Sequence, residues 1–412
     1  MSLFGLFERR NMESPGYPLT SSVLTDLLST GSDSGISVTE QSALKFSAVY
    51  RAVSLIANVS SSLPLKVYES GTRNERTSTL IGNPHPDLTP LELWRLSYVH
   101  RCLYGNFYAQ KMRTPAGQLQ YLFPIHPTAV KVGRVKYSPA NPSGKVFEVT
   151  HDDGHKVALT SNEVFHLPGW GYDGVTGVSP IRLAAQGIGL GLAAESYGAR
   201  LFGSGAMMSG ILQVEQRLEQ AAAEALQARW QAKVGGVGRA HQAVVLDSGA
   251  KWQSTTMPNT DAQFLESRNF QIGDIGTRIF GVPSFLMGLT EKSTSWGTGL
   301  EQQAIGWVTF DLSPQWLAPT EQRITKELTG ANRYAKYSVQ GLLRGDSTAR
   351  ANYYRVMREV GGLSANDIRD LEDRPPVEGG DTYLQPLNLA PLGTDNTTQM
   401  MTTGAPGDTV NP

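Results

Sequence analysis

Two prolines interrupt the longest helical pattern in this chain of 412 residues. The pattern runs from Leu300 to Leu328, and Pro314 and Pro319 fall inside it. A proline within a helix removes a backbone donor and clashes with the preceding turn, which costs about 3 kcal/mol for each residue. A chain keeps two such residues only where the fold needs a bent or interrupted helix. The sequence therefore predicts a kinked helix in this region.

A shorter helix and a polar loop precede the kinked helix. Apolar residues recur at spacings of mainly three, four and seven over residues 261–281, which predicts one apolar helical face. Pro283 ends that helix, because proline disfavours a helical residue before it. Residues 288–299 are rich in small and hydroxyl side chains and predict a loop. The centre of this loop consists of Lys292, Ser293, Thr294, Ser295 and Trp296.

Three runs in this region carry a likeness to a known family: Phe264-LESRNF, Arg278-IFGVPSFLMG and, after the loop, Glu301-Gln302-Gln303. Their combination is long and unusual, and it resembles the portal proteins of long-tailed bacteriophages with double-stranded DNA. That family builds a ring at one capsid vertex, through which DNA is packaged and ejected. The resemblance implies that the helix, loop and bent helix line the channel and that residues 292–296 face the DNA.

The resemblance also implies the fold class, an α+β portal-like architecture. Its expected parts are a flexible N-terminal arm (1–42), a mixed α/β wing (43–177), a first stem helix (178–207), a small α/β clip (208–258), a second stem helix (259–284), a tunnel loop (285–299), a long kinked helix with a wing strand (300–344), a helical crown (345–378) and a disordered tail (379–412).

Local patterns in the expected wing predict several elements. An amphipathic helix spans residues 43–63, and an alternating strand begins at Leu65. A second helix has Thr89 as its N-cap, followed by Pro90 in the first turn, and ends at Gly105. We expect the buried stripe of this helix to consist of Leu93, Leu96, Val99 and Leu103. Strands follow at Phe107, Leu119, Ala129, Lys145 and Lys156.

A cluster of histidines and aspartates lies between the last two of these strands. His151, Asp152, Asp153 and His155 surround Gly154, a composition typical of a tight turn. Metal binding is the alternative, but no further ligand pattern accompanies them. We therefore expect a solvated hairpin.

The expected first stem helix carries glycines at positions 187, 189, 191 and 198. Each glycine inside a helix costs about 0.5–1 kcal/mol relative to alanine. Close approach of another backbone must offset this cost, which favours tightly packed helices of neighbouring subunits. A phosphate-binding turn at Gly189 and Gly191 is disfavoured because no strand precedes it.

The stretch between the two stem helices predicts a strand, a helix and two further strands, beginning at Ile211, Leu218, Ala243 and Lys251. This is the expected clip, and the resemblance implies that it meets packaging and tail components. The candidate docking residues are Arg229, Lys233, Arg239 and His241. An ordinary solvated surface is the alternative for any one of them.

Near the C-terminus, a capped helix beginning at Asp346 is stopped by Gly361 and Gly362, and Ser364 with Asp367 approximates a capping box. This region resembles the tail of the family, although Asp367 stands where the family usually has glutamate.

Composition limits the function classes. The formal net charge of −1 argues against a tight general DNA binder, because such affinity comes from many contacts of lysine and arginine with phosphates. The single cysteine, Cys102, excludes an internal disulfide framework. No stretch has the pattern of a secretion signal or of a membrane span. No catalytic, cofactor or metal motif is present, so we expect no enzyme, no cofactor and no metal.

The resemblance implies a closed homo-oligomeric ring, with a dodecamer expected from the family. The expected partners are non-specific double-stranded DNA, the terminase large subunit, a head–tail adaptor, and the major capsid and scaffold proteins, with no membrane. The expected location is the capsid vertex of the virion, after assembly in the host cytoplasm. The alternatives are a scaffold-type capsid assembly protein that is not a portal, and an enzyme with an unrecognised acid–base site.

The channel segment, residues 261–330, carries eight acidic and five basic residues, a net charge of −3. A conduit must surround phosphates without holding them, since each neutralised phosphate adds affinity. The net charge therefore favours a lining that does not adhere to DNA. Within the loop, Trp296 braces the loop or touches the duplex; the alternative is that it packs against the following helix.

Overall fold

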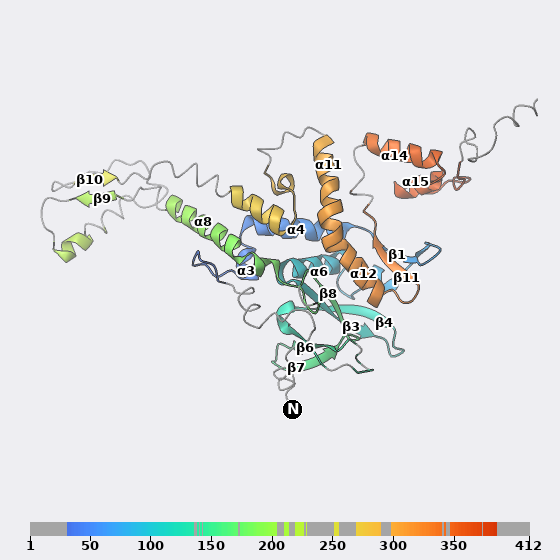
Figure 1. Cartoon of the computed structure of the whole chain (residues 1–412), viewed down its shortest axis with the longest axis horizontal. Helices are drawn as coiled ribbons and strands as arrows, with labels where there is room; N and C mark the ends of the chain where they lie inside the picture. Colours follow the sequence, from blue (N-terminus) through green and yellow to red (C-terminus); the bar gives the residue numbers. More distant parts are fainter. Residues whose placement is uncertain are drawn as a thin grey trace, which may run out of the picture. The chain divides into compact units, whose positions relative to one another are not determined.

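The computed structural model describes residues 31–135, 138–139, 141, 143–171, 174–203, 210–213, 219–225, 228, 251–254, 269–289, 298–339, 342, 347–372 and 374–384. The chain divides into two compact units, residues 1–339 and 340–412. The first unit combines helices with antiparallel sheets (Figure 1). The coarse expectation of an α+β fold is confirmed.

Two helices form the centre of the first unit. They are α4 (Ser47–Ser62) and α6 (Pro90–Tyr104), which pack against each other. A capping box of Thr89 and Glu92 starts α6, and Gly105 ends it with a φ of +75°. Both ends lie where the sequence placed them. Between the two helices lie β1 (Leu65–Glu69), β2 (Glu75–Arg76) and α5 (Thr79–Gly82).

The buried face of α6 differs in part from the predicted stripe. Leu93 and Leu103 are buried, but Leu96 and Val99 are only partly buried, so those two assignments were wrong. The reason is that α6 contacts α4 as well as strands β3 and β8, and so needs buried side chains around more of its circumference. The additional buried side chains are Trp94, Ser97, Tyr98, His100, Arg101 and Cys102.

The described residues of the first unit also form three antiparallel sheets of three strands each. The first has the order β4-β3-β8 and consists of Leu119–Ile125, Asn106–Arg113 and Val164–Pro168. The second has the order β5-β6-β7 and consists of Val130–Arg134, Lys145–Thr150 and Lys156–Thr160. The third joins β11 (Arg333–Tyr337) to β1 and β2, with Leu65 opposite Tyr337. The short 3-10 helix η1 (Pro127–Ala129) precedes β5.

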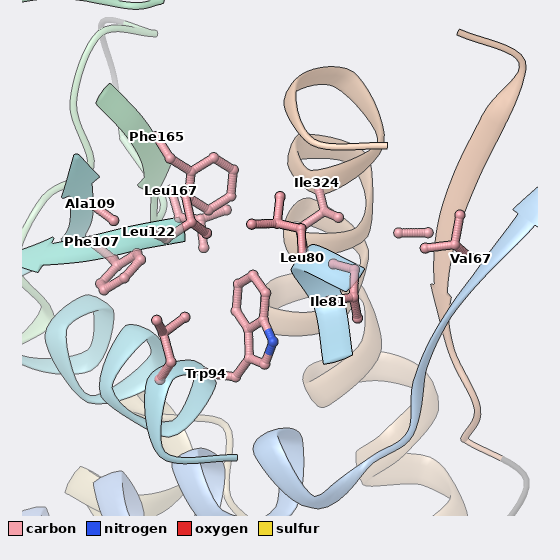
Figure 2. Close-up of a cluster of buried hydrophobic side chains, with 12 residues drawn as sticks. Val67, Leu80, Ile81, Trp94, Phe107, Ala109, Leu122, Phe165, Leu167 and Ile324 are labelled. Atoms are coloured by element: carbon pink, nitrogen blue, oxygen red, sulfur yellow. The ribbon is translucent and has the colours of Figure 1, made fainter. Parts of the chain in front are cut away.

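A hydrophobic cluster joins α6, the β4-β3-β8 sheet and the later helix α12 (Ala318–Glu327) (Figure 2). Trp94 from α6, Phe165 from β8 and Ile324 from α12 all belong to this cluster. Full burial of one such side chain stabilises the fold by about 1.5–3 kcal/mol. A second cluster packs the β5-β6-β7 sheet and consists of Tyr108, Phe147, Val149, Leu159 and Val164.

The turn between β6 and β7 is the expected hairpin. The His151 N–H donates to the His155 carbonyl at 2.8 Å, and Gly154 has a φ of +80°. Among the residues that the structure describes, no group of three histidine, cysteine, aspartate or glutamate side chains has the arrangement to hold a metal ion.

The later part of the predicted arm is packed. Val38 is fully buried, and the short helix α3 (Glu40–Ala43) places Glu40 against Arg182, with Nε donating to Oε1 at 2.9 Å. The Ser32 hydroxyl and the Asp33 N–H both donate to Gln186 Oε1 at 2.9 Å. These contacts hold residues 32–43 against the start of the expected stem helix.

That stem region consists of α7 (Pro180–Leu183) and α8 (Ala185–Gly203). Two of its glycines, Gly189 and Gly191, are approached from within the same chain. A Cβ built on Gly189 would lie 2.4 Å from the Ser32 hydroxyl, and one on Gly191 would lie 2.9 Å from the Phe46 ring. We expected the backbone of a neighbouring subunit to approach these glycines. At these two positions the structure has side chains of residues 32–46 of the same chain instead. A Cβ on Gly187 would meet nothing within 4 Å.

In the expected clip, β9 (Gly210–Gln213) pairs antiparallel with β10 (Lys251–Ser254), and Gln213 lies opposite Lys251. The strands predicted from Ile211 and Lys251 are thus confirmed, whereas the one from Ala243 lies outside the described residues.

The second unit contains α14 (Ser347–Glu359) and α15 (Ala365–Leu371). Gly361 has a φ of +69°, and Ser364 and Asp367 form the predicted capping box.

Candidate functional site

The residues predicted to form sites lie outside the described part of the chain. This holds for the tunnel-loop residues Lys292, Ser293, Thr294, Ser295 and Trp296 and for the clip residues Arg229, Lys233, Arg239 and His241. The structure does describe the two segments that flank the loop, residues 269–289 and 298–339.

The segment before the loop ends in a π-helical turn, η3 (Ile275–Ile279). The Val282 N–H then donates to the Gly276 carbonyl at 2.8 Å. A short 3-10 helix, η4 (Ser284–Met287), folds back so that Met287 covers Gly276, where a Cβ would lie 2.7 Å from its Cγ. The Arg51 side chain on α4 donates to the Leu286 carbonyl at 3.0 Å. The chain thus enters the loop from a fixed direction.

The segment after the loop lies against the segment before it, at Gly281. Gly281 has a φ of +67°, and a Cβ built on it would lie 2.6 Å from Asp311 Oδ1. Only glycine adopts this backbone conformation at no steric cost, and only glycine leaves room for the Asp311 side chain. Burial raises the pKa of the Asp311 carboxyl. The Asp311 side chain therefore lies against Gly281, so the described segments before and after the loop meet at these two residues.

The kinked helix is built from three consecutive parts: α11 (Thr298–Trp307), the π-helix η5 (Val308–Leu317) and α12. Pro314 lies inside the π-helix, where the chain is wound more widely than in an α-helix. Pro319 lies in the first turn of α12, a position that proline tolerates better than the helix interior. The predicted interruption is present, and its form is a π-helix.

A buried arginine completes the hydrogen bonding at this interruption. Pro319 has no N–H, so the Gln315 carbonyl four residues earlier lacks its α-helical donor. Arg101 Nη2 donates to that carbonyl at 3.2 Å. Arg101 Nη1 donates to the Trp316 carbonyl at 3.2 Å and to Thr320 Oγ1 at 2.9 Å. An arginine on α6 thereby supplies the donors that the proline-containing helix needs.

We call Arg101 and the groups that contact it the arginine cage. These groups are the Gln315 and Trp316 carbonyls, Thr320 Oγ1 and the rings of Tyr98 and Trp316. The Arg101 side chain is 1% exposed, and its guanidinium carbon lies 5.2 Å from the Trp316 ring centroid and 5.7 Å from that of Tyr98. Burial lowers the pKa of the guanidinium, but arginine stays protonated in proteins. Carbonyls, a hydroxyl and aromatic faces compensate the charge here. Removal of the side chain takes the donor from the Gln315 carbonyl and from Thr320 Oγ1, while the Trp316 carbonyl keeps the Thr320 hydroxyl at 2.7 Å.

Further polar contacts fix α12 beyond the cage. The Tyr98 hydroxyl donates to the Tyr337 hydroxyl at 3.0 Å, and burial raises the pKa of both phenols. Glu321 Oε1 accepts from the Tyr337 N–H at 2.7 Å. At the end of α12, Glu327 accepts from the almost fully buried Lys111 of β3 at 2.7 Å. Helix α12 is therefore tied to α6, β11 and β3.

Two of these contacts alter the charge argument for the channel. Glu321 and Glu327 count among the eight acidic residues of the segment, but each is engaged inside the subunit. Two of the five basic residues are paired as well, Arg278 with Asp274 and Arg323 with Glu327. The sequence count therefore includes charges of both signs that are paired within the chain.

Sequence reasoning missed the arginine cage and the Lys111–Glu327 pair. One signal was available for the first: Arg101 lies between apolar turns of a helix predicted to be buried, in a chain whose later helix has lost a donor at Pro319. No comparable signal indicates Lys111, because alternation in a strand does not distinguish a buried lysine from an exposed one.

The arrangement defines a class of protein. The described residues form a body of helices and sheets whose buried polar groups hold a bent helix in place. These polar groups serve a structural role. No described helix is both long and apolar enough to cross a membrane.

Comparison with known proteins identifies the family. The family model described as phage portal protein matches residues 47–373. The portal protein of Enterobacteria phage HK97 is 30% identical, over 86% of this chain and 85% of its own length. The probable portal protein of Streptomyces phage phiC31 is 33% identical, over 87% of this chain and 82% of its own length.

Solved structures show the same fold. An HK97-family phage portal protein from Corynebacterium diphtheriae is similar with a TM-score of 0.56 at 17% identity, covering 74% of this chain and 96% of that one. The neck of a native gene transfer agent particle, computed with C12 symmetry, has a chain with a TM-score of 0.54 at 19% identity, covering 82% and 94%.

The chain belongs to the phage portal protein family. It is a structural, non-enzymatic component of the virion at the capsid vertex, and the resemblance seen in the sequence is confirmed. Family membership removes the two alternatives, a scaffold-type protein that is not a portal and an enzyme.

Proposed function

We propose that copies of this chain close into a ring of twelve, with the wing, stem, clip, tunnel-loop and crown divisions expected from the sequence. The ring conducts double-stranded DNA into the capsid and out of it. The C12 symmetry of the similar gene transfer agent neck supports the subunit number. Head-to-tail contacts between copies close into a ring when the rotation between neighbours divides a full turn.

The ring has a direct test. Electron microscopy of the purified protein is expected to show a closed ring with a central hole wide enough for duplex DNA. A preparation that contains only compact monomers contradicts the ring.

The tunnel loop, with Lys292, Ser293, Thr294, Ser295 and Trp296, faces the DNA in this proposal. One observation supports it: Gly281 and Asp311 lie against each other, so the two described segments that flank the loop come together. Met287 packs on Gly276 in the first segment, and Arg101 holds the second. Segments held in this way keep the ends of the loop in position while DNA moves past it.

Lys292 is the single cation of the central loop, flanked by hydroxyl side chains. One phosphate contact per subunit gives weak, salt-sensitive attraction rather than tight binding. Trp296 either touches the duplex or braces the loop. In the second role it holds Lys292 in position. The loop then guides the DNA without arresting it.

A packaging assay tests the loop. Rings that carry Lys292→Ala or Trp296→Ala are expected to fill capsids more slowly or less completely than unaltered rings. Lys336→Ala, at an exposed position on β11, is the matched control and is expected to package normally. Normal rate and normal filling in both loop variants overturn the role of the loop.

The clip residues Arg229, Lys233, Arg239 and His241 form the docking face for the head–tail adaptor and the terminase large subunit in this proposal. The antiparallel pairing of β9 with β10 supports a self-contained clip, because it joins the first and last strands of the insertion. Contacts with the major capsid and scaffold proteins lie elsewhere on the ring. Replacement of the four residues by alanine is expected to weaken capture of the adaptor while rings still form, and unchanged capture overturns this assignment.

A further inference from the structure

Helix α14 carries an exposed apolar stripe, here called the α14 stripe, which consists of Tyr353, Val356 and Val360. At 3.6 residues per turn, the three positions fall within an arc of about 60°. Tyr353 is 40% exposed, Val356 is 47% exposed and Val360 is 65% exposed. The helix is coloured orange-red in Figure 1. A contiguous apolar face of this kind is typical of a surface that another segment covers.

The stripe is separate from the face of α14 that packs on α15. The Tyr354 hydroxyl donates to Glu372 Oε1, and Arg350 Nη1 lies 3.5 Å from Glu372 Oε2. Met357 covers Gly362, where a built Cβ would lie 2.6 Å from the Met357 Cε. Within the described residues of the second unit, these contacts leave the stripe open.

One asparagine fixes the path of the chain after α15. The Val377 N–H donates to Asn366 Oδ1 at 2.8 Å. Asn366 Nδ2 donates to the Val377 carbonyl and to Asp381 Oδ1, both at 2.9 Å. The Asn366 N–H donates to the Gly380 carbonyl at 2.9 Å. Residues 377–381 are therefore tied back to the first turn of α15.

This return brings the backbone to one end of the α14 stripe. Gly361 directly follows Val360, and a Cβ built on Gly361 would lie 2.9 Å from the Leu384 carbonyl oxygen. The chain therefore continues beyond Leu384 from the Val360 end of the stripe. Along the helix the stripe is about 10 Å long, at 1.5 Å per residue. Four residues of extended chain span that distance.

The sequence that follows Leu384 is suited to covering such a face. Residues 385–394 carry no charge. Pro386 and Pro391 disfavour a helix and favour extended backbone in the residues before them. The large apolar residues of this sequence are Leu387, Leu389 and Leu392. Alternate side chains of an extended segment share one face, so the first two of these leucines are expected on the same side.

We propose that residues 385–392 lie along the α14 stripe of their own copy and run antiparallel to the helix. At the rises of helical and extended chain, Leu387 comes close to Val356, and Leu389 comes close to Tyr353. Extended proline-containing segments dock on surfaces that carry aromatic rings, and Tyr353 supplies one. The tether at Leu384 gives the segment a high effective concentration at this face, which favours the same copy over another copy.

Single-cysteine labelling of unassembled subunits provides the test. Cys102 is the only cysteine in the sequence and is buried, so an introduced thiol reports its own surroundings. Val356→Cys places a thiol on the stripe. Ala351→Cys, at an exposed position of α14 about 140° away around the helix axis, is the matched control. Each thiol is alkylated with iodoacetamide in the full chain, with and without the pair Leu387→Asp and Leu389→Asp.

The two aspartates are expected to release the segment, because a charge resists burial on an apolar face. The Val356→Cys thiol is then expected to react at least ~10-fold faster than in the chain with both leucines, which corresponds to about 1.4 kcal/mol of local opening. The Ala351→Cys thiol is expected to react equally in both chains, which shows that the helix itself is unchanged. Equal reactivity of Val356→Cys in both chains overturns the proposal. The measurement uses single subunits, so its outcome is independent of whether rings form.

A cross-link identifies the copy that supplies the segment. Full chains with Val356→Cys and Leu387→Cys are oxidised with copper phenanthroline, and the products are separated on a non-reducing gel. A disulfide within one chain is expected, with the two linked peptides identified by mass spectrometry. Ala351→Cys with Leu387→Cys is the control pair and is expected to link far less. Linked dimers as the main product show that another copy supplies the segment and overturn the assignment to the same chain.

Discussion

Helices α12 and α8 are held in opposite ways. Helix α12 is fixed by buried polar contacts within one copy, from Arg101 near its start to Lys111 at its end. Helix α8 is held by glycine packing and by surface hydrogen bonds through Gln186, and it leaves large apolar side chains exposed. The bend of the long helix is therefore set by contacts inside each copy, whereas α8 keeps apolar surface exposed.

The largest expected effect comes from removing the buried polar contacts that Arg101 makes near the start of α12. Arg101→Met keeps much of the side-chain volume but removes the donors to the Gln315 carbonyl and to Thr320 Oγ1, whereas the Trp316 carbonyl keeps the Thr320 hydroxyl. Because buried acceptors without partners cost about 1–3 kcal/mol each, the free energy of unfolding is expected to fall by about 3 kcal/mol. Urea denaturation of the unassembled subunit measures this change. Arg95→Met, at an exposed position of the same helix, is the control and is expected to change stability little.

Acidic pH is expected to lower the free energy of unfolding through His100, which lies next to Arg101 on α6. Burial, helped by His126, lowers the pKa of His100 to about 4, so the folded state resists a proton that the unfolded chain accepts near pH 6.5. The unfolded state then binds more protons between those values, and stability falls as the pH decreases from 6.5 towards 4. The contribution of His100 is about 2–3 kcal/mol across this window. A His100→Gln variant is expected to show a shallower decline over the same range, and an equal slope contradicts this assignment.

A double-mutant cycle sharpens the role of Arg101. Pro319→Ala restores an N–H that can donate to the Gln315 carbonyl, so it replaces one of the bonds that Arg101 supplies. The loss caused by Arg101→Met is expected to be smaller in the Pro319→Ala background, by about 1 kcal/mol. Strict additivity of the two changes in urea unfolding shows that the arginine does not compensate for the proline.

The smallest expected effect is on the α8 side. Gln186→Ala removes exposed hydrogen bonds to Ser32 and Asp33. Surface substitutions of this kind usually change stability by no more than about 0.5 kcal/mol. A loss of several times that size in thermal unfolding contradicts the view that α8 is lightly held within one copy.

Local signals in the sequence predicted the helix ends well. Thr89 with Glu92 and Ser364 with Asp367 form the capping boxes that their spacing indicates, because capping depends on neighbours three residues apart. The two prolines likewise marked the interruption of the long helix, since the lost N–H is a property of the residue itself.

Contacts between distant segments were not predictable in the same way. Arg101 and Gln315 are more than two hundred positions apart in the sequence. Periodicity in apolar residues does not predict where a buried cation lies. Strand β8 was missed because Val164, Phe165, His166 and Leu167 are all buried, so no alternation marks it. The packed part of the N-terminal arm depends on the Glu40–Arg182 pair, which spacing does not indicate. The loop and clip residues stay predictions.

Hydrogen exchange on unassembled subunits and on rings tests the central contrast most directly. Amides of α8 are expected to gain protection when the ring closes, while amides of residues 314–327 are expected to be equally protected in both states. Strong protection of α8 in the lone subunit, together with protection of residues 314–327 that appears only in the ring, contradicts the account.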